Sequence, residues 1–340
     1  MVLEMTANQV FLPDAPAIDG LTFRPFQADT DYHFVAELGN VSNAADGVED
    51  FVTFEWVKNY LSHMAGSNPG RDILFAEIDG QPVALTRVWS RLLDDGTRLY
   101  MNAGSVLPQW RRQGLGRALL HWAEWRLRAI AATQPAAGAR AFRSFGSDHE
   151  PGAMALLEHE GYAPVRYGFE MARSLTEPIP DLPLPSGVEV RSVRPERYRQ
   201  VYADMNEAFR DHWGHSEATA EDYLRWINSP HFQPHLWQVA WAGNAVAGMV
   251  LNYIDADYNE NFKRLRGWTD PICVRGPWRK QGLAKALIAR SMHALKAQGM
   301  TEVGLGVDAD NPNGALRLYE SLGYRQVMRF LTYEKPLVEV

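Results

Sequence analysis

Residues 279–285 form a short basic loop with the composition of an anion-binding site. They follow an apolar run, Ile272-Cys273-Val274, that is typical of a buried strand, and they lead into a helix expected over 285–297. Free N–H groups at a helix start, together with the helix dipole, favour a bound anion, and three cationic side chains add full positive charge. The loop therefore predicts a site for a pyrophosphate group. Its residues are Arg279, Lys280, Gln281, Gly282, Leu283, Ala284 and Lys285.

A second loop of the same kind lies 168 positions earlier in the chain. The run PQWRRQGLGRALL at 108–120 is repeated as GPWRKQGLAKALI at 276–288. A single such loop is also compatible with a tight strand-to-helix turn, but two copies at matched positions favour the anion site. The Walker and dinucleotide-binding glycine patterns are both absent. The matching residues are Arg111, Arg112, Gln113, Gly114, Leu115, Gly116 and Arg117.

The two loops belong to a longer internal repeat. LTFRPF at 21–26 matches VEVRSV at 188–193, and LLEHEGY at 156–162 matches LYESLGY at 318–324. Between the copies, residues 174–187 contain four prolines in a short stretch, which indicates a semi-rigid linker. We predict an N-terminal extension over 1–20, a first domain over 21–173, a linker over 174–187 and a second domain over 188–337.

Each copy alternates helical and strand-like segments. Helices are expected over 29–38 and 195–209. Strands are expected over 72–78, 81–89, 236–242 and 245–254, where β-branched and aromatic residues are separated by turn residues. This order predicts an α/β or α+β fold with a mixed sheet in each of two tandem domains.

The composition is that of an ordinary globular protein. The chain has 340 residues, 46% of them hydrophobic, and a formal net charge of −7. An acidic surface disfavours non-specific nucleic-acid and membrane binding and favours cationic partners such as amines. Cys273 is the only cysteine, no segment has the length and apolarity of a membrane span, and the N-terminus does not resemble a signal peptide. We expect a cytoplasmic protein without a metal, nucleic-acid or membrane partner.

The loop pattern R-x-x-G-x-G/A after a strand, followed by NPNGALRLYESLGY at 311–324, resembles the GNAT superfamily of N-acetyltransferases. The resemblance covers nearly the whole chain after residue 20. The tandem arrangement is similar to mycothiol synthase and its wider relatives. It implies that acetyl-CoA is the cofactor and that the loops bind its pyrophosphate. By position, the further cofactor-binding candidates are Ile272, Cys273, Val274 and Asn311, with Gly104, Ser105 and Val106 in the first copy.

The resemblance also implies an acid and a base. Tyr319 occupies the position of the tyrosine that protonates the departing thiolate, although Ala315, Leu318, Tyr319 and Leu322 also form a core-facing stripe. Asp270 is the carboxylate on the strand that enters the loop, and strict alternation would place it on one face with Ile272 and Val274. Asp270 could instead serve as a turn residue before Pro271. Asp255, Asp257 and Glu260 are alternative bases.

The first copy keeps the loop but departs from the motif that follows it. Aligning 161–162 with 323–324 puts Leu157 opposite Tyr319, His149 opposite Asn311 and Pro151 opposite Asn313. Since leucine cannot donate a proton, we expect a degenerate first domain and an active second one.

These observations predict transfer of an acetyl group to a primary amine of a small molecule by direct attack in a ternary complex. His212 and Trp213 are candidates for lining the acceptor pocket. Mycothiol synthesis and detoxification of an aminoglycoside-like amine are both open, as are a monomer and a homodimer. The alternative is a non-catalytic acyl-CoA-binding sensor or scaffold.

Overall fold

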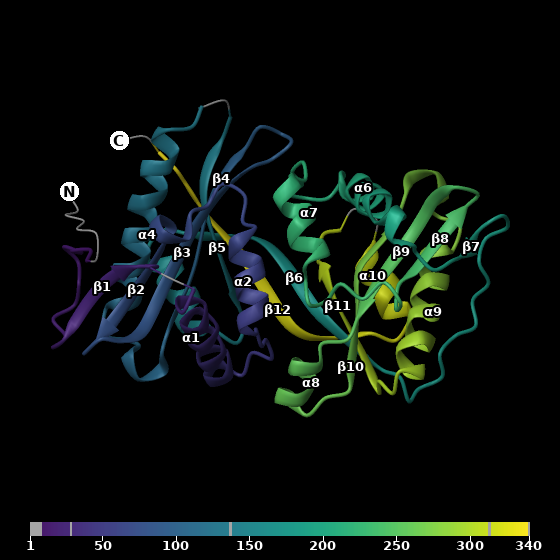
Figure 1. Cartoon of the computed structure of the whole chain (residues 1–340), viewed down its shortest axis with the longest axis horizontal. Coiled ribbons are helices and arrows are strands. Elements are labelled where there is room, and N and C mark those ends of the chain that lie inside the picture. The colour runs from purple at the N-terminus through teal and green to yellow at the C-terminus, as the bar shows by residue number, and fades with distance from the viewer. Residues whose placement is uncertain (1–8, 28, 136–137, 312–313, 339–340) are drawn as a thin grey trace. The chain divides into compact units, whose positions relative to one another are not determined.

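The computed structural model describes residues 9–27, 29–135, 138–311 and 314–338. The chain forms two compact units (Figure 1). Unit 1 contains the residues up to Val165, with Thr219–Arg225 and the chain from Leu331 onward. Unit 2 contains Arg166–Ala218 and Trp226–Phe330.

Unit 1 is built on a sheet with helices packed on it. Its strands, in spatial order, are β1 (Leu21–Pro25), β2 (Ile73–Ile78), β3 (Gln81–Leu92), β4 (Arg98–Val106), β5 (Arg140–Ser147) and the end of β12 (Arg325–Pro336). Its helical elements are α1 (Asp31–Asp46), α2 (Phe54–Ser62), α3 (Pro69–Asp72), η1 (Pro108–Trp110), α4 (Leu115–Ala132), α5 (Pro151–His159) and most of α7 (Ala220–Ile227).

Unit 2 repeats this plan. Its strands run in the order β6 (Ala163–Ser174), β11 (Glu302–Asp308), β10 (Arg266–Val274), β9 (Ala245–Tyr253), β8 (Gln238–Ala242) and β7 (Glu189–Val190). Its helical elements are η2 (Pro195–Arg197), α6 (Tyr198–Phe209), α8 (Ala256–Phe262), η3 (Gly276–Trp278), α9 (Leu283–Ala297) and α10 (Ala315–Ser321).

The predicted mixed sheets are confirmed. In unit 1, β2 and β3 pair antiparallel across the turn Asp79-Gly80, where φ is +50° and +78°. Such left-handed pairs make the tight turns that fit the twist of a hairpin. By contrast, β4 pairs parallel with β5, and β10 pairs parallel with β11. Each parallel pair requires a crossover, which helices α4 and α9 provide.

The two sequence copies exchange their last strands. In unit 2, β6 of the first copy pairs antiparallel with β11, from Ser174 opposite Glu302 to Gly168 opposite Asp308. In unit 1, the yellow end of β12 lies beside β5 (Figure 1). Leu331 and Tyr333 of β12 are buried in the apolar core of that unit. Each unit therefore takes its last strand from the other copy.

The helix that follows each glycine loop packs on one face of its sheet. In unit 2, Leu287, Met292 and Leu295 of α9 are fully buried against Val303 and Leu305 of β11. Each such side chain contributes about 2 kcal/mol through burial. On the other face, α6 packs over Cys273 and β9. The start of α9 is thereby fixed relative to the end of β10.

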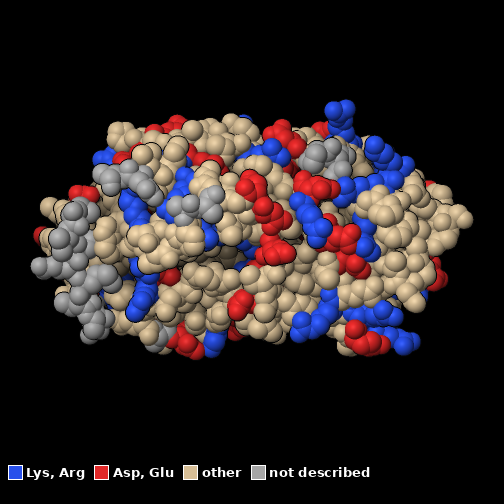
Figure 2. Space-filling model, turned by 90° about the horizontal axis from the view of Figure 1, so that it is seen from above, with Lys and Arg blue, Asp and Glu red and all other residues tan. Residues whose placement is uncertain are grey.

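The described helices include none that is long and apolar enough to cross a membrane. On the face seen in Figure 2, acidic and basic side chains are interspersed, so this face has no single large acidic patch.

Candidate active site

The second glycine loop has the backbone geometry of an anion cradle. Lys280 and Gly282 both adopt left-handed conformations, with φ of +60° and +84°. Gly282 caps α9, and the first helical bond runs from the Ala286 N–H to the Gly282 carbonyl at 3.1 Å. The N–H groups before Ala286 have no partner within the helix, as at any helix start. A Cβ on Gly282 would meet nothing within 4 Å, so the approach to the turn is open.

The side chain of Arg279 holds this loop in place. Its Nε donates to the Val274 carbonyl at 3.0 Å, and one terminal nitrogen donates to the Ala208 carbonyl at 3.1 Å. The other terminal nitrogen lies 3.2 Å from the Asp211 carboxylate. The guanidinium therefore ties β10 and the end of α6 to the loop. The positive charges left for an anion are those of Lys280 and Lys285, which are exposed and have no ion pair among the described residues.

Arg111 makes the same three contacts in unit 1. It donates to the Val106 carbonyl at 2.9 Å and to the Ser42 carbonyl at 3.3 Å, and it pairs with Asp46 at 2.6 Å. The arginine of the repeated pattern thus has a positioning part in both units.

A β-bulge separates Asp270 from the strand residues that follow it. Thr269 lies opposite Asn252, but Ile272 already lies opposite Val250, so β10 has one extra residue at Asp270-Pro271. An extra residue reverses the alternation of side chains. The expectation that Asp270 shares a face with Ile272 and Val274 is therefore wrong.

Asp270 shares its face with Trp268 before the bulge and Cys273 after it. Trp268 lies opposite Tyr253, and Cys273 lies opposite Met249 on the same side of β9. Cys273 belongs to the core beneath α6, whereas Ile272 and Val274 pack against the core beneath α9.

Two glycines of β11 make room for side chains of β10 on this face. A Cβ on Gly304 would lie 2.8 Å from the Trp268 ring, and a Cβ on Gly306 would lie 3.9 Å from Oδ2 of Asp270. The parallel ladder joins Arg266–Trp268 to Glu302–Gly304. After Trp268, β10 enters the bulge at Asp270-Pro271. β11 continues to Asp308 and stays paired with β6.

Asp270 is reached by solvent and yet crowded by protein. Asp270 is an exposed residue of β10, yet protein atoms crowd its carboxyl group. This crowding removes water and raises the pKa of Asp270 to about 6. A carboxyl in this state can take up and release a proton near neutral pH.

Tyr319 lies in α10 with 7% of its surface exposed, packed in the core of unit 2. Its ring centroid is 6.0 Å from that of Tyr324, whose hydroxyl lies 3.2 Å from the Thr269 hydroxyl. Burial raises the pKa of Tyr319, and Asp270, Tyr324 and Cys273 raise it further. The phenol therefore keeps its proton. Tyr319 is a core residue, and the negative charge of Asp270 acts on its hydroxyl; its part in proton transfer stays a prediction.

The alternative bases have structural contacts of their own. Asp255 caps α8 by accepting from the Tyr258 N–H at 2.9 Å, and it pairs with His231 at 3.0 Å. Asp257 and Glu260 are exposed on α8.

The two acceptor-pocket candidates follow helix α6. The His212 ring lies edge-on to Phe209 at 4.6 Å, and burial lowers the pKa of His212. Trp213 is 42% exposed, and the Arg166 guanidinium lies 5.3 Å from its ring centroid. Among the described residues, no group of three or more His, Cys, Asp or Glu side chains could hold a metal ion.

Unit 1 has a different arrangement at the matching positions. β4 pairs with β3 in continuous register from Arg98 to Val106. Asn102 stands where the sequence alignment puts Asp270, and its amide donates to the Arg143 carbonyl and the Tyr162 hydroxyl, each at 3.4 Å. Leu157 is buried in the core.

The loop of unit 1 also differs in its surroundings. Arg117, which matches Lys285, pairs with Glu160 at 2.8 Å. His149 lies 3.0 Å from the Gly47 carbonyl, whereas the Asn311 N–H donates to Asp308 at 3.2 Å. Pro151 begins α5, and its counterpart Asn313 lies outside the described residues.

Three features of the site were not predicted from the sequence. The alternating glycines of EVGLGVD signal a face on which another strand's side chains need room, and a proline inside a strand signals a bulge. The buried Arg266, which pairs with Glu170 at 2.8 Å and Glu302 at 3.1 Å, gave no signal, because one of its partners comes from the first copy.

Comparison with known families gives two matches. Residues 198–324 match the Acetyltransferase (GNAT) family, and residues 69–163 match an Acetyltransferase (GNAT) domain.

Among curated proteins, the chain is similar to mycothiol acetyltransferase from Geodermatophilus obscurus, with 30% identity over 293 residues, 85% of this chain and 89% of that protein. It is also similar to mycothiol acetyltransferase from Thermomonospora curvata, with 33% identity over 245 residues, 68% of this chain and 72% of that protein.

Two solved structures share the fold over nearly the whole length. A GCN5-related N-acetyltransferase from Sphaerobacter thermophilus has a TM-score of 0.70 and 26% identity, covering 95% of this chain and 98% of that one. A tandem GNAT protein from the clavulanic acid biosynthesis pathway has a TM-score of 0.67 and covers 94% and 99%. Its identity of 17% supports a likeness of fold alone.

Proposed function

Because the chain belongs to the GNAT acetyltransferase family, we propose that unit 2 transfers an acetyl group from acetyl-CoA to a primary amine of a small molecule. The observation that carries the proposal is the open helix start at Gly282, flanked by the exposed Lys280 and Lys285, with Asp270 on the strand that leads into it. A proton acceptor, a proton donor and an anion cradle are the three things that such a transfer requires.

The residues present in unit 2 fit coenzyme A. The N–H groups of Leu283, Ala284 and Lys285 at the start of α9 would bind the pyrophosphate, with Lys280 and Lys285 supplying positive charge. The backbone of β10 at Ile272, Cys273 and Val274 would bind the pantetheine arm. When bound, acetyl-CoA supplies a thioester carbonyl that an amine can attack.

Asp270 and Tyr319 divide the proton transfers in this proposal. Asp270 accepts the proton that the amine gives up as its nitrogen bonds to the carbonyl carbon. Tyr319 gives its proton to the sulfur as the carbon–sulfur bond breaks. The environments of the two residues suit these roles. Asp270 is exposed to solvent and can release the proton that it accepts. Tyr319 is buried and keeps its proton until the thiolate forms.

The same reasoning assigns no turnover to unit 1. Leu157 cannot donate a proton, and Asn102 is a neutral amide whose hydrogen bonds are made within the fold. The active site of the proposal is therefore that of the C-terminal copy.

The names of the curated relatives favour an acceptor from mycothiol chemistry over an aminoglycoside-like one. The competing function is a non-catalytic acyl-CoA sensor. An amine panel that includes the mycothiol precursor separates these functions when acetyl-CoA is added and thiol release is measured. Specific turnover of one amine supports the enzyme, whereas tight coenzyme A binding without turnover of any amine supports the sensor.

A further inference from the structure

The proline-rich segment in front of each unit is itself repeated. Residues 12–20, LPDAPAIDG, match residues 179–187, IPDLPLPSG, and we call these segments strap 1 and strap 2. Both end in a left-handed glycine, with φ of +74° at Gly20 and +76° at Gly187. Both close with the same backbone bond, Leu21 N–H to Ile18 and Val188 N–H to Pro185, each at 3.2 Å. The N-terminal segment therefore has a defined structural counterpart.

Strap 1 lies against the start of helix α4. The Asp14 carboxylate is 2.9 Å from Nδ1 of His121, whose Nε2 is 2.9 Å from Glu160. The Pro16 ring lies 3.5 Å from the place that a Cβ on Gly114 would occupy. Leu12 is buried in the unit 1 core, which anchors the strap. Strap 1 thus contacts the glycine that opens the first loop.

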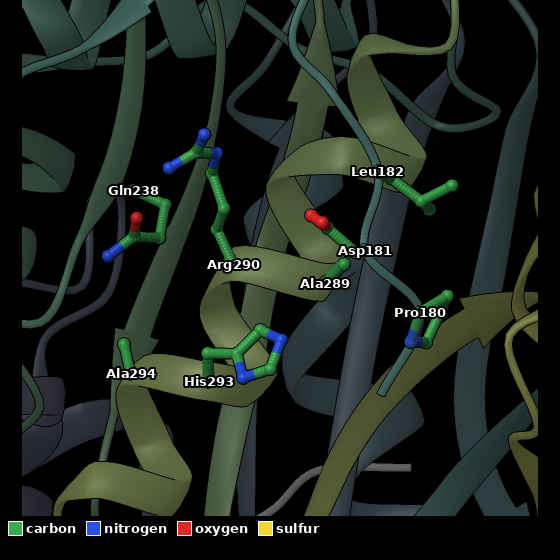
Figure 3. Close-up of a pocket in the computed structure, with 8 residues that line it drawn as sticks. All are labelled: Pro180, Asp181, Leu182, Gln238, Ala289, Arg290, His293 and Ala294. Carbon is green, nitrogen blue, oxygen red and sulfur yellow. The ribbon is translucent and has the colours of Figure 1, made fainter. Parts of the chain in front are cut away.

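Strap 2 does not reach the second loop. Ala289 stands where unit 1 has His121, so Asp181 has no matching histidine. A Cβ on Gly282 would meet nothing within 4 Å. A hollow of about 240 Å³ remains between strap 2 and α9, lined in part by Asp181, Arg290 and His293 (Figure 3).

We propose that strap 1 closes the first glycine loop, so that the chain binds one coenzyme A, in unit 2. This inference rests on the proposed function of the second loop. The Pro16 ring fills space over Gly114 that a pyrophosphate would need. Asp14, paired with His121 in the second turn of α4, holds the strap in that place. Glu160 also pairs with Arg117, so it competes for a cation of the first loop.

Calorimetric titration of the full chain with coenzyme A tests this inference. We expect one molecule bound per chain, and we expect Lys280→Glu/Lys285→Glu to weaken that binding at least tenfold, since each substitution puts an anion where a cation would contact the phosphates. Two molecules per chain would overturn the strap inference alone. Binding of one molecule that the double variant leaves undiminished would overturn both the strap inference and the proposed cofactor site of unit 2. No binding at all would overturn the proposed function.

A strap variant tests the cause of the closure. In the Lys280→Glu/Lys285→Glu background, Asp14→Ala/Pro16→Ala removes the ion pair and the ring but keeps the Leu12 anchor. We expect binding of one coenzyme A to return. Native circular dichroism without any regained binding would show that the strap does not close the loop.

Discussion

Gly306 leaves a Cβ position that lies 3.9 Å from Oδ2 of Asp270, whereas Gly304 leaves one only 2.8 Å from the Trp268 ring. The two glycines are neighbours on one face of β11, but they tolerate a methyl group to different degrees. A distance of 3.9 Å is an ordinary contact, and 2.8 Å is an overlap with a rigid ring.

This difference predicts unequal effects of two matched substitutions. Gly304→Ala should lower the free energy of unfolding by about 1–3 kcal/mol, because the indole must shift within a packed sheet. Gly306→Ala should change it by less than about 0.5 kcal/mol. Urea denaturation of both variants measures the difference, and equal losses would contradict the described packing.

The state of Asp270 predicts a pH dependence of activity. Desolvation raises the pKa of Asp270 to about 6, so kcat/KM should rise tenfold per pH unit below that value and level off above it. Asp270→Asn should lower kcat/KM by at least about 100-fold and remove this limb. A wild-type limb that persists in the variant would assign the base elsewhere.

The Asp270 carboxyl should also make the stability of the folded protein depend on pH. Stability should fall as the pH rises, whereas activity should rise. The folded pKa lies above the unfolded value of about 4, so the folded state holds more protons in this window. Asp270 therefore costs stability progressively as the pH rises from about 4 to about 6, and the cost stays constant above that. The thermal midpoint of Asp270→Asn should exceed that of the wild type at pH 8 and match it near pH 3. A lower midpoint at pH 8 would contradict the desolvation.

The twin arginines predict a separation of stability from activity. Arg279→Ala and Arg111→Ala should each lower the free energy of unfolding by about 1–3 kcal/mol, because each leaves two carbonyls and a carboxylate without a donor. Arg279→Ala should also lower kcat/KM, since the loop it holds is the proposed cofactor site. Equal losses of activity in both variants would indicate that unit 1 takes part in turnover.

The thiol of Cys273 should not react with alkylating reagents in the folded protein. Burial raises the pKa of this thiol to about 12, so little thiolate forms at pH 8. Iodoacetamide should label Cys273 only after unfolding, as mass spectrometry of the native and denatured chain can show. Rapid labelling of the native protein would contradict the packing beneath α6.

The sequence was informative where local chemistry decides structure. The mixed sheets, the strand-to-helix loops and the helix that carries Tyr319 follow from apolar periodicity and glycine placement. The domain boundaries at 21–173 and 188–337 remain predictions. The compact units of the structure do not coincide with these sequence ranges, because β6 and the end of β12 each belong to the unit of the other copy.

Other features depend on tertiary geometry that no local pattern specifies. One extra residue in β10 inverted the expected face of Asp270, and alternation alone cannot reveal it. The part of Arg279 as a pyrophosphate ligand stays a prediction, whereas its hydrogen bonds to the carbonyls of Val274 and Ala208 could not be read from the sequence. Strap 1 escaped notice because its match to strap 2 lies in proline spacing rather than in a strand or a helix.

The central claim is that Tyr319 of unit 2 protonates the departing thiolate. Steady-state thiol release by Tyr319→Phe, with coenzyme A affinity measured in parallel, tests it most directly, and Tyr324→Phe is the matched control in the same core. We predict a fall in kcat of at least about 100-fold for Tyr319→Phe, coenzyme A affinity within about twofold of the wild type, and a much smaller fall in kcat for Tyr324→Phe. An unchanged kcat in Tyr319→Phe would contradict the account.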